Sequence, residues 1–169
     1  MKLAYIPLFS LFLLASAHAK ETEVDVIYNT RNLTPEAALI VAKNAMLACR
    51  KEGTHVAVAV LDNGGRLQVL LRDRLAGFST PDGAILKAKT AINFRSPTEA
   101  FSAAINANPK ASGIAHLPDV LLLGGGLPIE ASGSLVGAIG VAGAPGGEMD
   151  EQCAQVGIDA IQEALEFAD

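Results

Sequence analysis

The sequence predicts a single α+β domain in which helices alternate with β-hairpins. Helical patterns of apolar residues alternate along the chain with short runs of strand type. The first long strand, VAVAVL at residues 56–61, is apolar on both sides. A strand of this kind is typical of a central position with helices packed on both faces of the sheet. No internal repeat or linker divides the chain, so one domain is expected.

The first 19 residues have the pattern of an export signal. Lys2 precedes an apolar stretch from Leu3 to Ala15, and the small residues of Ala17-His18-Ala19 suit a signal peptidase. The stretch is too short to span a bilayer, so no stable membrane insertion is expected. A buried N-terminal helix is the alternative. With cleavage after Ala19, residues 20–169 form one domain that we expect to be periplasmic or secreted.

Charge and composition exclude two classes of protein. Without the signal, the chain has 12 basic and 18 acidic side chains, a net charge of −6 with neutral histidines. It has no basic run and no interleaved basic and aromatic residues, so nucleic acid is not an expected partner. Half of the residues are apolar, which is inconsistent with an intrinsically disordered chain.

The first predicted elements are a short strand, a long helix and a hairpin. The segment EVDVIY (23–28) predicts the short strand. Residues 34–36 (TPE) combine an N-cap, a first-turn proline and an acid, and the helix that they open runs to Cys49 and stops before Gly53. Residues 55–73 then predict two strands, because the sequence DNGG at 62–65 tolerates the positive φ angles of a tight turn.

The second half of the chain predicts further helices and a second pair of strands. One helix runs from Thr80 to Arg95, and the capping-box pattern at 96–99 (SPTE) opens another that reaches about Asn106. A loop at 106–119 leads to a strand that contains three glycines. The next strand is LVGAIGVAG, 135–143, and a final helix runs to about Phe167.

The three consecutive glycines, Gly124, Gly125 and Gly126, do not fit a phosphate-binding loop. Such loops have the pattern GxxxxGK or GxGxxG before a helix whose N-terminal amides bind the anion. Here Leu127, Pro128 and an extended segment follow instead. The bare backbone permits the close approach of another backbone, a helix or a planar ligand. Internal packing and a ligand-binding crevice therefore both remain open.

Two cysteines remain after cleavage, Cys49 and Cys153, and both lie in predicted helices. A disulfide between them is permitted in an exported protein. The alternative is two small buried apolar side chains. Neither cysteine lies in a CxxC or CxxCH pattern, which disfavours zinc and covalent haem attachment.

Seven fragments of the chain resemble, in order and spacing, the GlcG/HbpS family. They are LDNGGRL, RDRLAGFST, KAKTA, FRSPT, LGGGLPI, GSLVGAIGVAG and DEQCAQVGIDAI, and the resemblance extends from about Leu33 to Leu165. The family includes extracellular haem-binding proteins and the C-terminal domain of PduO. The resemblance implies a roughly profilin-like antiparallel sheet of about five strands flanked by helices. It also implies homo-oligomers and haem as a cofactor, with haem degradation reported in the family.

A haem site needs an axial ligand, an apolar slot and cations for the propionates. His116, in the loop before the glycine run, is the candidate iron ligand, and His55, at the start of a strand, is a second candidate. The alternatives are a surface histidine at 116 and a hydrogen-bonded histidine at the edge of the core at 55. The flat slot is expected beside Gly124, Gly125 and Gly126.

The chain departs from the family in one respect. Many relatives have a histidine in the stretch that corresponds to AGFST, where this chain has Phe78 and Ser79. Ligation through an oxygen and binding without a strong axial bond therefore remain alternatives. The hydroxyl groups considered are those of Tyr28, Thr80 and Thr90.

Arg72 and Lys87 are the candidate anion-binding residues, because they fall on the family's RD and KAxTA positions. Either could bind a haem propionate or the carboxylate of a small organic acid. Lys89 and Arg95 are interpreted instead as part of a solvated helix face.

Two functions follow from these patterns. The first is an exported haem-binding protein that scavenges, senses or degrades haem. The alternative is a binding protein or enzyme for a small hydroxy or aromatic acid, with Asp73 or Glu130 as an acid–base group. No nucleophile or metalloprotease motif supports a stronger catalytic assignment, so catalysis is left open. The small residues of LVGAIGVAG predict a homo-oligomer on separate grounds.

Overall fold

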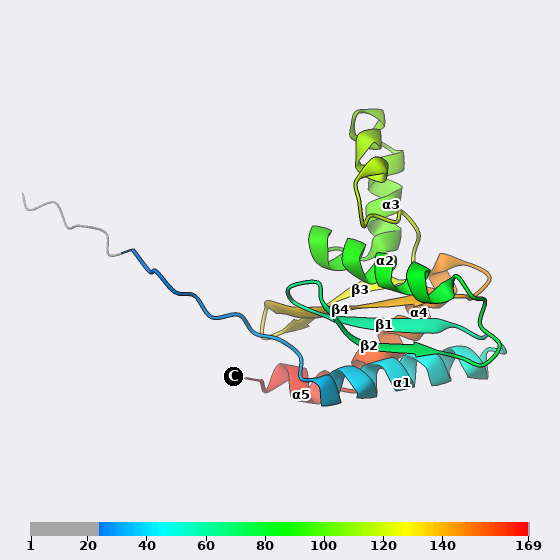
Figure 1. Cartoon of the computed structure of the whole chain (residues 1–169), viewed down its shortest axis with the longest axis horizontal. Helices are drawn as coiled ribbons and strands as arrows, with labels where there is room; N and C mark the ends of the chain where they lie inside the picture. Colours follow the sequence, from blue (N-terminus) through cyan, green and yellow to red (C-terminus); the bar gives the residue numbers. More distant parts are fainter. Residues whose placement is uncertain (1–23, 169) are drawn as a thin grey trace, which may run out of the picture.

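The computed structural model describes residues 24–168, which form an antiparallel sheet with helices on both faces (Figure 1). The strand order is β2-β1-β4-β3. The strands are β1 (Ala57–Asp62), β2 (Leu67–Arg72), β3 (Gly126–Ala131) and β4 (Ser134–Ala142). The helices are α1 (Pro35–Lys51), α2 (Thr80–Phe94), α3 (Thr98–Asn106), the 3₁₀ helix η1 (Pro109–His116), α4 (Gly147–Asp159) and α5 (Gln162–Glu166). The predicted α+β class with a flanked antiparallel sheet is confirmed.

The sheet has four strands rather than about five. The segment expected to add a strand, residues 24–28, has no regular secondary structure, and its apolar side chains are exposed. Alternation alone does not make a strand, because the backbone also needs a partner edge. The chain first joins the sheet at Leu33, whose N–H donates to the carbonyl of Val136 at 3.1 Å. The predicted export signal lies outside the described residues.

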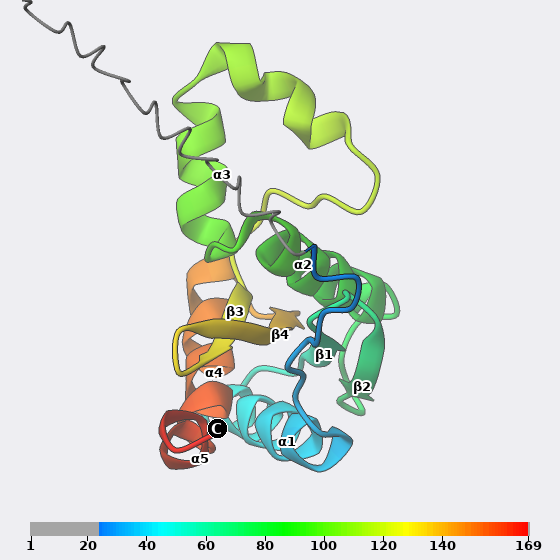
Figure 2. The ribbon, with the colours of Figure 1, turned by 90° about the vertical axis from the view of Figure 1, so that its left-hand side faces the viewer.

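Strand β1 is central and covered on both faces, as predicted. Its valines pack in a core shared with α1 and α4. Its opposite face, Ala57, Ala59 and Leu61, packs against alanines of α2. Figure 2 shows α2 on one side of the sheet and α1 on the other. The small side chains let α2 approach closely, and a side chain on Gly140 of β4 would collide with the carbonyl of Ala84.

Helix α1 begins as the sequence predicts, with the Thr34 hydroxyl accepting the N–H of Ala37 at 3.2 Å. The helix ends beside α4, to which it is covalently joined. Cys49 and Cys153 form a disulfide with a Cα–Cα distance of 5.5 Å across 104 residues of sequence. The disulfide alternative for these cysteines is therefore confirmed.

Helix α3 and η1 form an arm that projects from the body of the domain (Figures 1 and 2). The arm is anchored by Phe101, whose ring stacks on that of Phe94 with centroids 4.1 Å apart. The predicted helix at 98–106 is present, but the predicted capping box is not. Its N-cap is Pro97, and no side chain caps the helix.

The C-terminal end of the described chain lies beside the residues that lead into α1. The predicted C-terminal helix is broken into α4 and α5 around Ile161. Arg31 donates to the carbonyl of Ala131 at 3.1 Å and to that of Ala168 at 2.9 Å, which ties the segment before α1 to β3 and to the C-terminal end. Across residues 24–168, no helix combines the length and the hydropathy needed to cross a bilayer.

Candidate functional site

Two of the predicted site residues, His55 and Arg72, lie at one end of the sheet. In the antiparallel register, Ala57 at the start of β1 pairs with Arg72 at the end of β2 and with Ala142 at the end of β4. His55 and Asp73 lie just beyond these strand ends and are therefore neighbours. Strand β4 continues into Gly143, where an added Cβ would lie 2.7 Å from the carbonyl oxygen of His55.

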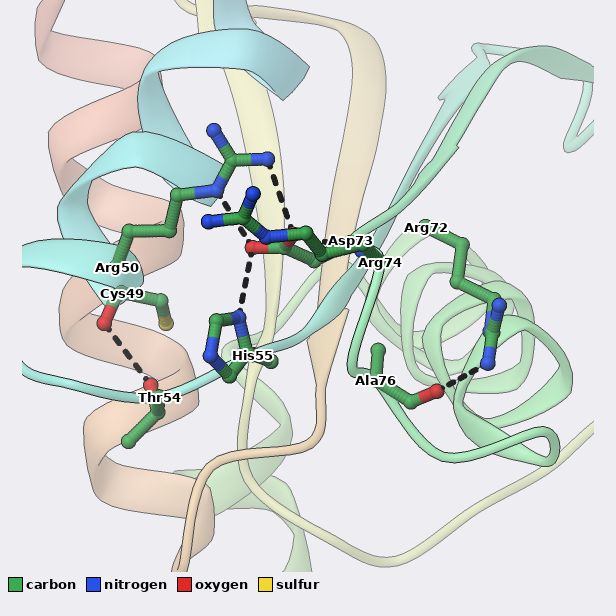
Figure 3. Close-up of polar contacts among 8 residues, drawn as sticks. All are labelled: Cys49, Arg50, Thr54, His55, Arg72, Asp73, Arg74 and Ala76. Atoms are coloured by element: carbon green, nitrogen blue, oxygen red, sulfur yellow. Dashed lines mark hydrogen bonds and ion pairs between the residues drawn. The ribbon is translucent and has the colours of Figure 1, made fainter.

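Asp73 is the centre of a charged cluster at this end of the sheet (Figure 3). Its side chain is fully buried, and Arg50 binds it with two hydrogen bonds, from Nε to Oδ2 at 2.6 Å and from Nη2 to Oδ1 at 3.0 Å. The backbone N–H of Arg74 donates to Oδ1 at 2.7 Å. His55 Nδ1 lies 3.2 Å from Oδ2. Three hydrogen bonds from Arg50 and Arg74 thus fix one carboxylate, and His55 lies against it.

These contacts keep Asp73 ionised. The hydrogen bond from Arg50 is the main cause that holds the pKa of Asp73 well below its ordinary value of 3.8; burial opposes it, and His55 and the Arg74 N–H add to it. The same hydrogen bond raises the pKa of Arg50. A carboxylate with so low a pKa is a poor proton acceptor at neutral pH. The geometry therefore disfavours the predicted acid–base role of Asp73.

His55 presents one nitrogen to the cluster and the other to the outside. Its Nδ1 is buried and close to Asp73, but the contact is not aligned as a hydrogen bond. Its Nε2 points away from the carboxylate (Figure 3), and the side chain is 30% exposed. His55 therefore lies at the edge of the core, as one of the two alternatives predicts. The side of its ring that faces away from Asp73 is not covered.

Arg72 stabilises the loop that follows β2. Its Nη2 donates to the carbonyl of Ala76 and its Nε to that of Gly77 at 3.4 Å. Figure 3 shows its side chain directed away from Asp73. The predicted role of Arg72 in anion binding is untested, but its guanidinium is already engaged in part.

The loop at 73–79 exposes two large apolar side chains. Leu75 is 70% exposed and Phe78 is 93% exposed. The loop begins at Asp73 and ends at Thr80, whose methyl group would be 3.4 Å from a Cβ on Gly143. The loop therefore leaves the charged cluster and returns close to the backbone of His55. Two large exposed apolar side chains on one short loop make this loop a candidate binding surface.

A hollow of about 360 Å³ adjoins this loop. The first turns of α2 and α4, the β4–α4 connection and two leucines, Leu121 and Leu123, line it. At its base Lys87 Nζ donates to Asp150 Oδ2 at 2.6 Å and to the carbonyl of Val141 at 2.9 Å. Burial raises the pKa of Asp150, an effect that Lys87 partly offsets.

Lys87 is therefore not the free cation that the sequence predicts for a propionate. It is 4% exposed, and its charge is neutralised within the protein. Lysine side chains are rarely buried unless paired, and the partner here comes from a helix 63 residues away in the sequence. The partner, Asp150, carries no sequence signal beyond its place in the first turn of a helix.

The glycine run is packed inside the protein rather than open to a ligand. Gly124, Gly125 and Gly126 are all buried. A Cβ on Gly125 would lie 2.6 Å from the carbonyl oxygen of Val141, and one on Gly126 would collide with the backbone of Lys87. The predicted crevice beside these residues is filled by α2 and by the start of α4, so this part of the prediction is wrong. Of the two alternatives, internal packing is the correct one.

His116 lies apart from the other predicted residues. It is exposed at the end of η1, on the projecting arm (Figure 2). Across the described part of the chain, no group of three or more His, Cys, Asp or Glu side chains is arranged to hold a metal ion. Lys89, interpreted as a surface residue, pairs with Asp119 at 2.8 Å, and Arg95 is exposed.

The sequence analysis missed Arg50, the main partner of Asp73. Arg50 lies in the last turn of α1, where a basic residue is expected simply to complement the helix dipole. The available signal was its position next to Cys49: once the disulfide places the end of α1, the adjacent side chain can reach the end of β2.

Comparison with known proteins identifies relatives with the same fold. The model of the family described as "Haem degrading protein HbpS-like" matches residues 33–159. A crystal structure of a double mutant of Streptomyces reticuli HbpS is 37% identical, with a TM-score of 0.77, and covers 86% of this chain and 98% of that one. A crystal structure of a PduOC:heme complex is 27% identical, with a TM-score of 0.71 and coverage of 77% and 95%.

A curated relative from Citrobacter freundii is similar in sequence. It is an uncharacterized 15.0 kDa protein in the dhaT-dhaS intergenic region, 29% identical over 110 residues. The match covers 64% of this chain and 77% of the relative. The residues that the family model matches, 33–159, include the end of the sheet where Asp73 lies.

Proposed function

Because the chain belongs to the HbpS-like family of haem-degrading proteins, we propose that it binds haem at the end of the sheet formed by His55, Asp73 and the loop at 73–79. The observation that carries this proposal is the exposed pair Leu75 and Phe78, on a loop that leaves a buried charged cluster and returns beside His55. The similarity to a PduOC:heme complex supports the choice of ligand.

The residues present at this surface fit haem. The exposed rings and aliphatic groups of Phe78 and Leu75 offer an apolar contact for a flat macrocycle. Arg74 is exposed, so a guanidinium group is available for the acidic edge of the ligand, whereas Arg50 is already bound to Asp73. His55 offers a nitrogen for the iron. When bound, haem would supply a redox-active iron, and the protein would position and shield it.

The alternative, a site for a small carboxylic acid, loses its expected cations. Lys87 is neutralised by Asp150, and Arg72 is bonded to carbonyl groups. The first turns of the two helices beside the hollow also carry acids, Asp82 and Glu148, which repel an anion. Haem binding depends on apolar contact as well as charge. Haem therefore suits the surface at the loop 73–79 better than a small carboxylic acid does.

A titration with haemin tests this proposal. We expect a shifted Soret band on addition of the purified protein and a Kd raised about tenfold in Phe78→Ser, because about 1.4 kcal/mol of apolar contact is lost. Phe167→Ser is the matched control: Phe167 is 78% exposed but lies at the end of α5. The absence of a Soret shift, or equal effects of the two substitutions, would contradict the proposal.

Export is part of the proposal. The Cys49–Cys153 disulfide supports it, because structural disulfides persist in oxidising compartments. We expect the protein expressed with its natural N-terminus in a bacterial host to be recovered from the periplasm or medium and to begin at Lys20. Recovery of unprocessed protein from the cytoplasm alone would argue against export.

We also propose that the protein forms homo-oligomers. The small residues of β4, on which the sequence-based prediction rests, no longer support this proposal. The small residues of β4 serve contact with α2 within the chain, as Gly140 and Ala84 show. Support comes instead from exposed apolar side chains on α1: Leu39, Ile40 and Leu47. Light scattering should give a mass at least twice that of the monomer, and Ile40→Lys should reduce it. A monomer at all concentrations would refute this.

A further inference from the structure

The imidazole of His55 is held in an arrangement that suits a metal ligand. Its Nδ1 is buried 3.2 Å from Oδ2 of Asp73, while Nε2 points away from the cluster (Figure 3). Histidines that ligate metals generally give their second ring N–H to a carboxylate or carbonyl, which fixes the tautomer and the direction of the ring. Asp73 is a carboxylate in that position.

Asp73 can orient His55 because it cannot move itself. Arg50 binds both of its oxygens and the Arg74 N–H binds Oδ1, in a fully buried site. With the proton on Nε2 instead, the Nδ1 lone pair would face the carboxylate oxygen of Asp73, and the two acceptors would repel each other. The proton of neutral His55 is therefore favoured on Nδ1, beside the carboxylate, where a small ring rotation would align the hydrogen bond. The lone pair is then on Nε2, at the open edge.

The other candidate ligands are less suitable. The Thr80 hydroxyl donates to the carbonyl of Gly77 at 2.7 Å. The Thr90 hydroxyl is buried, donates to the carbonyl of Leu86 and accepts the N–H of Leu121. His116 is exposed on the arm, where the described residues include no carboxylate paired with it. Tyr28 is exposed in the segment without secondary structure.

We therefore infer that His55 Nε2 is the axial ligand to the iron of bound haem, with Asp73 as the residue that positions it. This inference rests on the proposed haem binding. It assigns the ligand to the strand end rather than to the loop position where many relatives are expected to carry a histidine.

Resonance Raman spectroscopy of the ferrous haem complex tests this assignment. The wild-type protein should show an iron–histidine stretching band. His55→Gly should lose the band and bind haemin at least tenfold more weakly, and added imidazole should restore the band. His116→Ala, the matched control, should keep it. Asp73→Asn should keep the band but shift it to lower frequency, because a neutral amide makes the imidazole a weaker donor.

The outcomes separate the two proposals. A wild-type haem complex without an iron–histidine band, or a band that persists in His55→Gly and disappears in His116→Ala, overturns the ligand assignment but leaves haem binding in place. A wild-type protein that does not bind haemin overturns haem binding itself. If His55→Gly does not fold, His116→Ala decides the question: a band kept in this variant supports His55, and a band lost in it overturns the assignment.

Discussion

The Nζ of Lys87 lies 2.6 Å from Oδ2 of Asp150, and this contact joins two helices that pack on opposite faces of the sheet. Both side chains are almost fully buried at the base of the hollow beside the proposed site. The Asp150 carboxylate also accepts the N–H of Ala144, so it holds the β4–α4 connection as well. The pair is therefore a structural link across the edge of the sheet.

Lys87→Met should be strongly destabilising. It leaves the Asp150 carboxylate buried without its counter-charge, which costs about 3 to 5 kcal/mol in comparable buried pairs. Urea unfolding would measure the loss. Lys89→Met, on the same helix, removes a more exposed pair with Asp119 and should cost less than about 1 kcal/mol. Similar losses in the two variants would show that burial of the Lys87 pair is unimportant.

The stability provided by Asp73 should depend on pH. Its pKa in the folded protein lies below the ordinary 3.8, so its contribution is present above that value and is lost as the pH falls through the folded-state pKa. Asp73→Asn should be less stable than the wild type by about 2 kcal/mol at pH 7. The difference should shrink below about pH 4. Urea midpoints at several pH values would check this, and a constant difference would contradict it.

The packing of the glycine run can be tested by adding one methyl group. Gly126→Ala should destabilise the fold by about 1 to 3 kcal/mol, because the new Cβ collides with the backbone of Lys87. Gly113→Ala, in η1, meets no atom within 4 Å and should change the stability by less than about 0.5 kcal/mol. Thermal unfolding of the two variants would compare them. A neutral Gly126→Ala would mean that the run is not tightly packed.

The disulfide should contribute substantially to stability. It closes a loop of 104 residues, for which the chain-entropy model gives about 4 to 5 kcal/mol. The double substitution Cys49→Ser and Cys153→Ser should lower the unfolding free energy by about that amount. Reduction of the wild type should have the same effect, and the double variant should no longer respond to reductant. An unchanged midpoint would show that the crosslink contributes little.

The sequence predicts the elements best where local chemistry marks their ends. The Thr34 cap sets the start of α1, and Gly65, with φ +75°, sits in the β1–β2 turn as the DNGG pattern requires. The two apolar sides of β1 likewise predict its central place. Each of these signals depends on a few neighbouring residues, so no tertiary information is needed to interpret them.

The sequence-based predictions fail where contacts between distant parts of the chain determine the structure. Whether residues 24–28 form a strand depends on a partner edge, and whether bare glycine backbone faces a helix or a ligand depends on what packs there. Lys87 and Arg50 show the same limit, since their partners lie 63 and 23 residues away in the sequence. Of the predicted site, His55 and Arg72 do lie at one end of the sheet, while His116 lies elsewhere.

Arg31 donates to the carbonyl of Ala168, so the segment that leads into α1 lies beside the C-terminal end of the described chain. Proteins with adjacent ends generally tolerate circular permutation. A short linker from Ala168 to Arg31, with new termini opened at Gly113 on the arm, should preserve the sheet and its charged cluster. Such a rearranged chain would carry a fused reporter on the arm, away from His55.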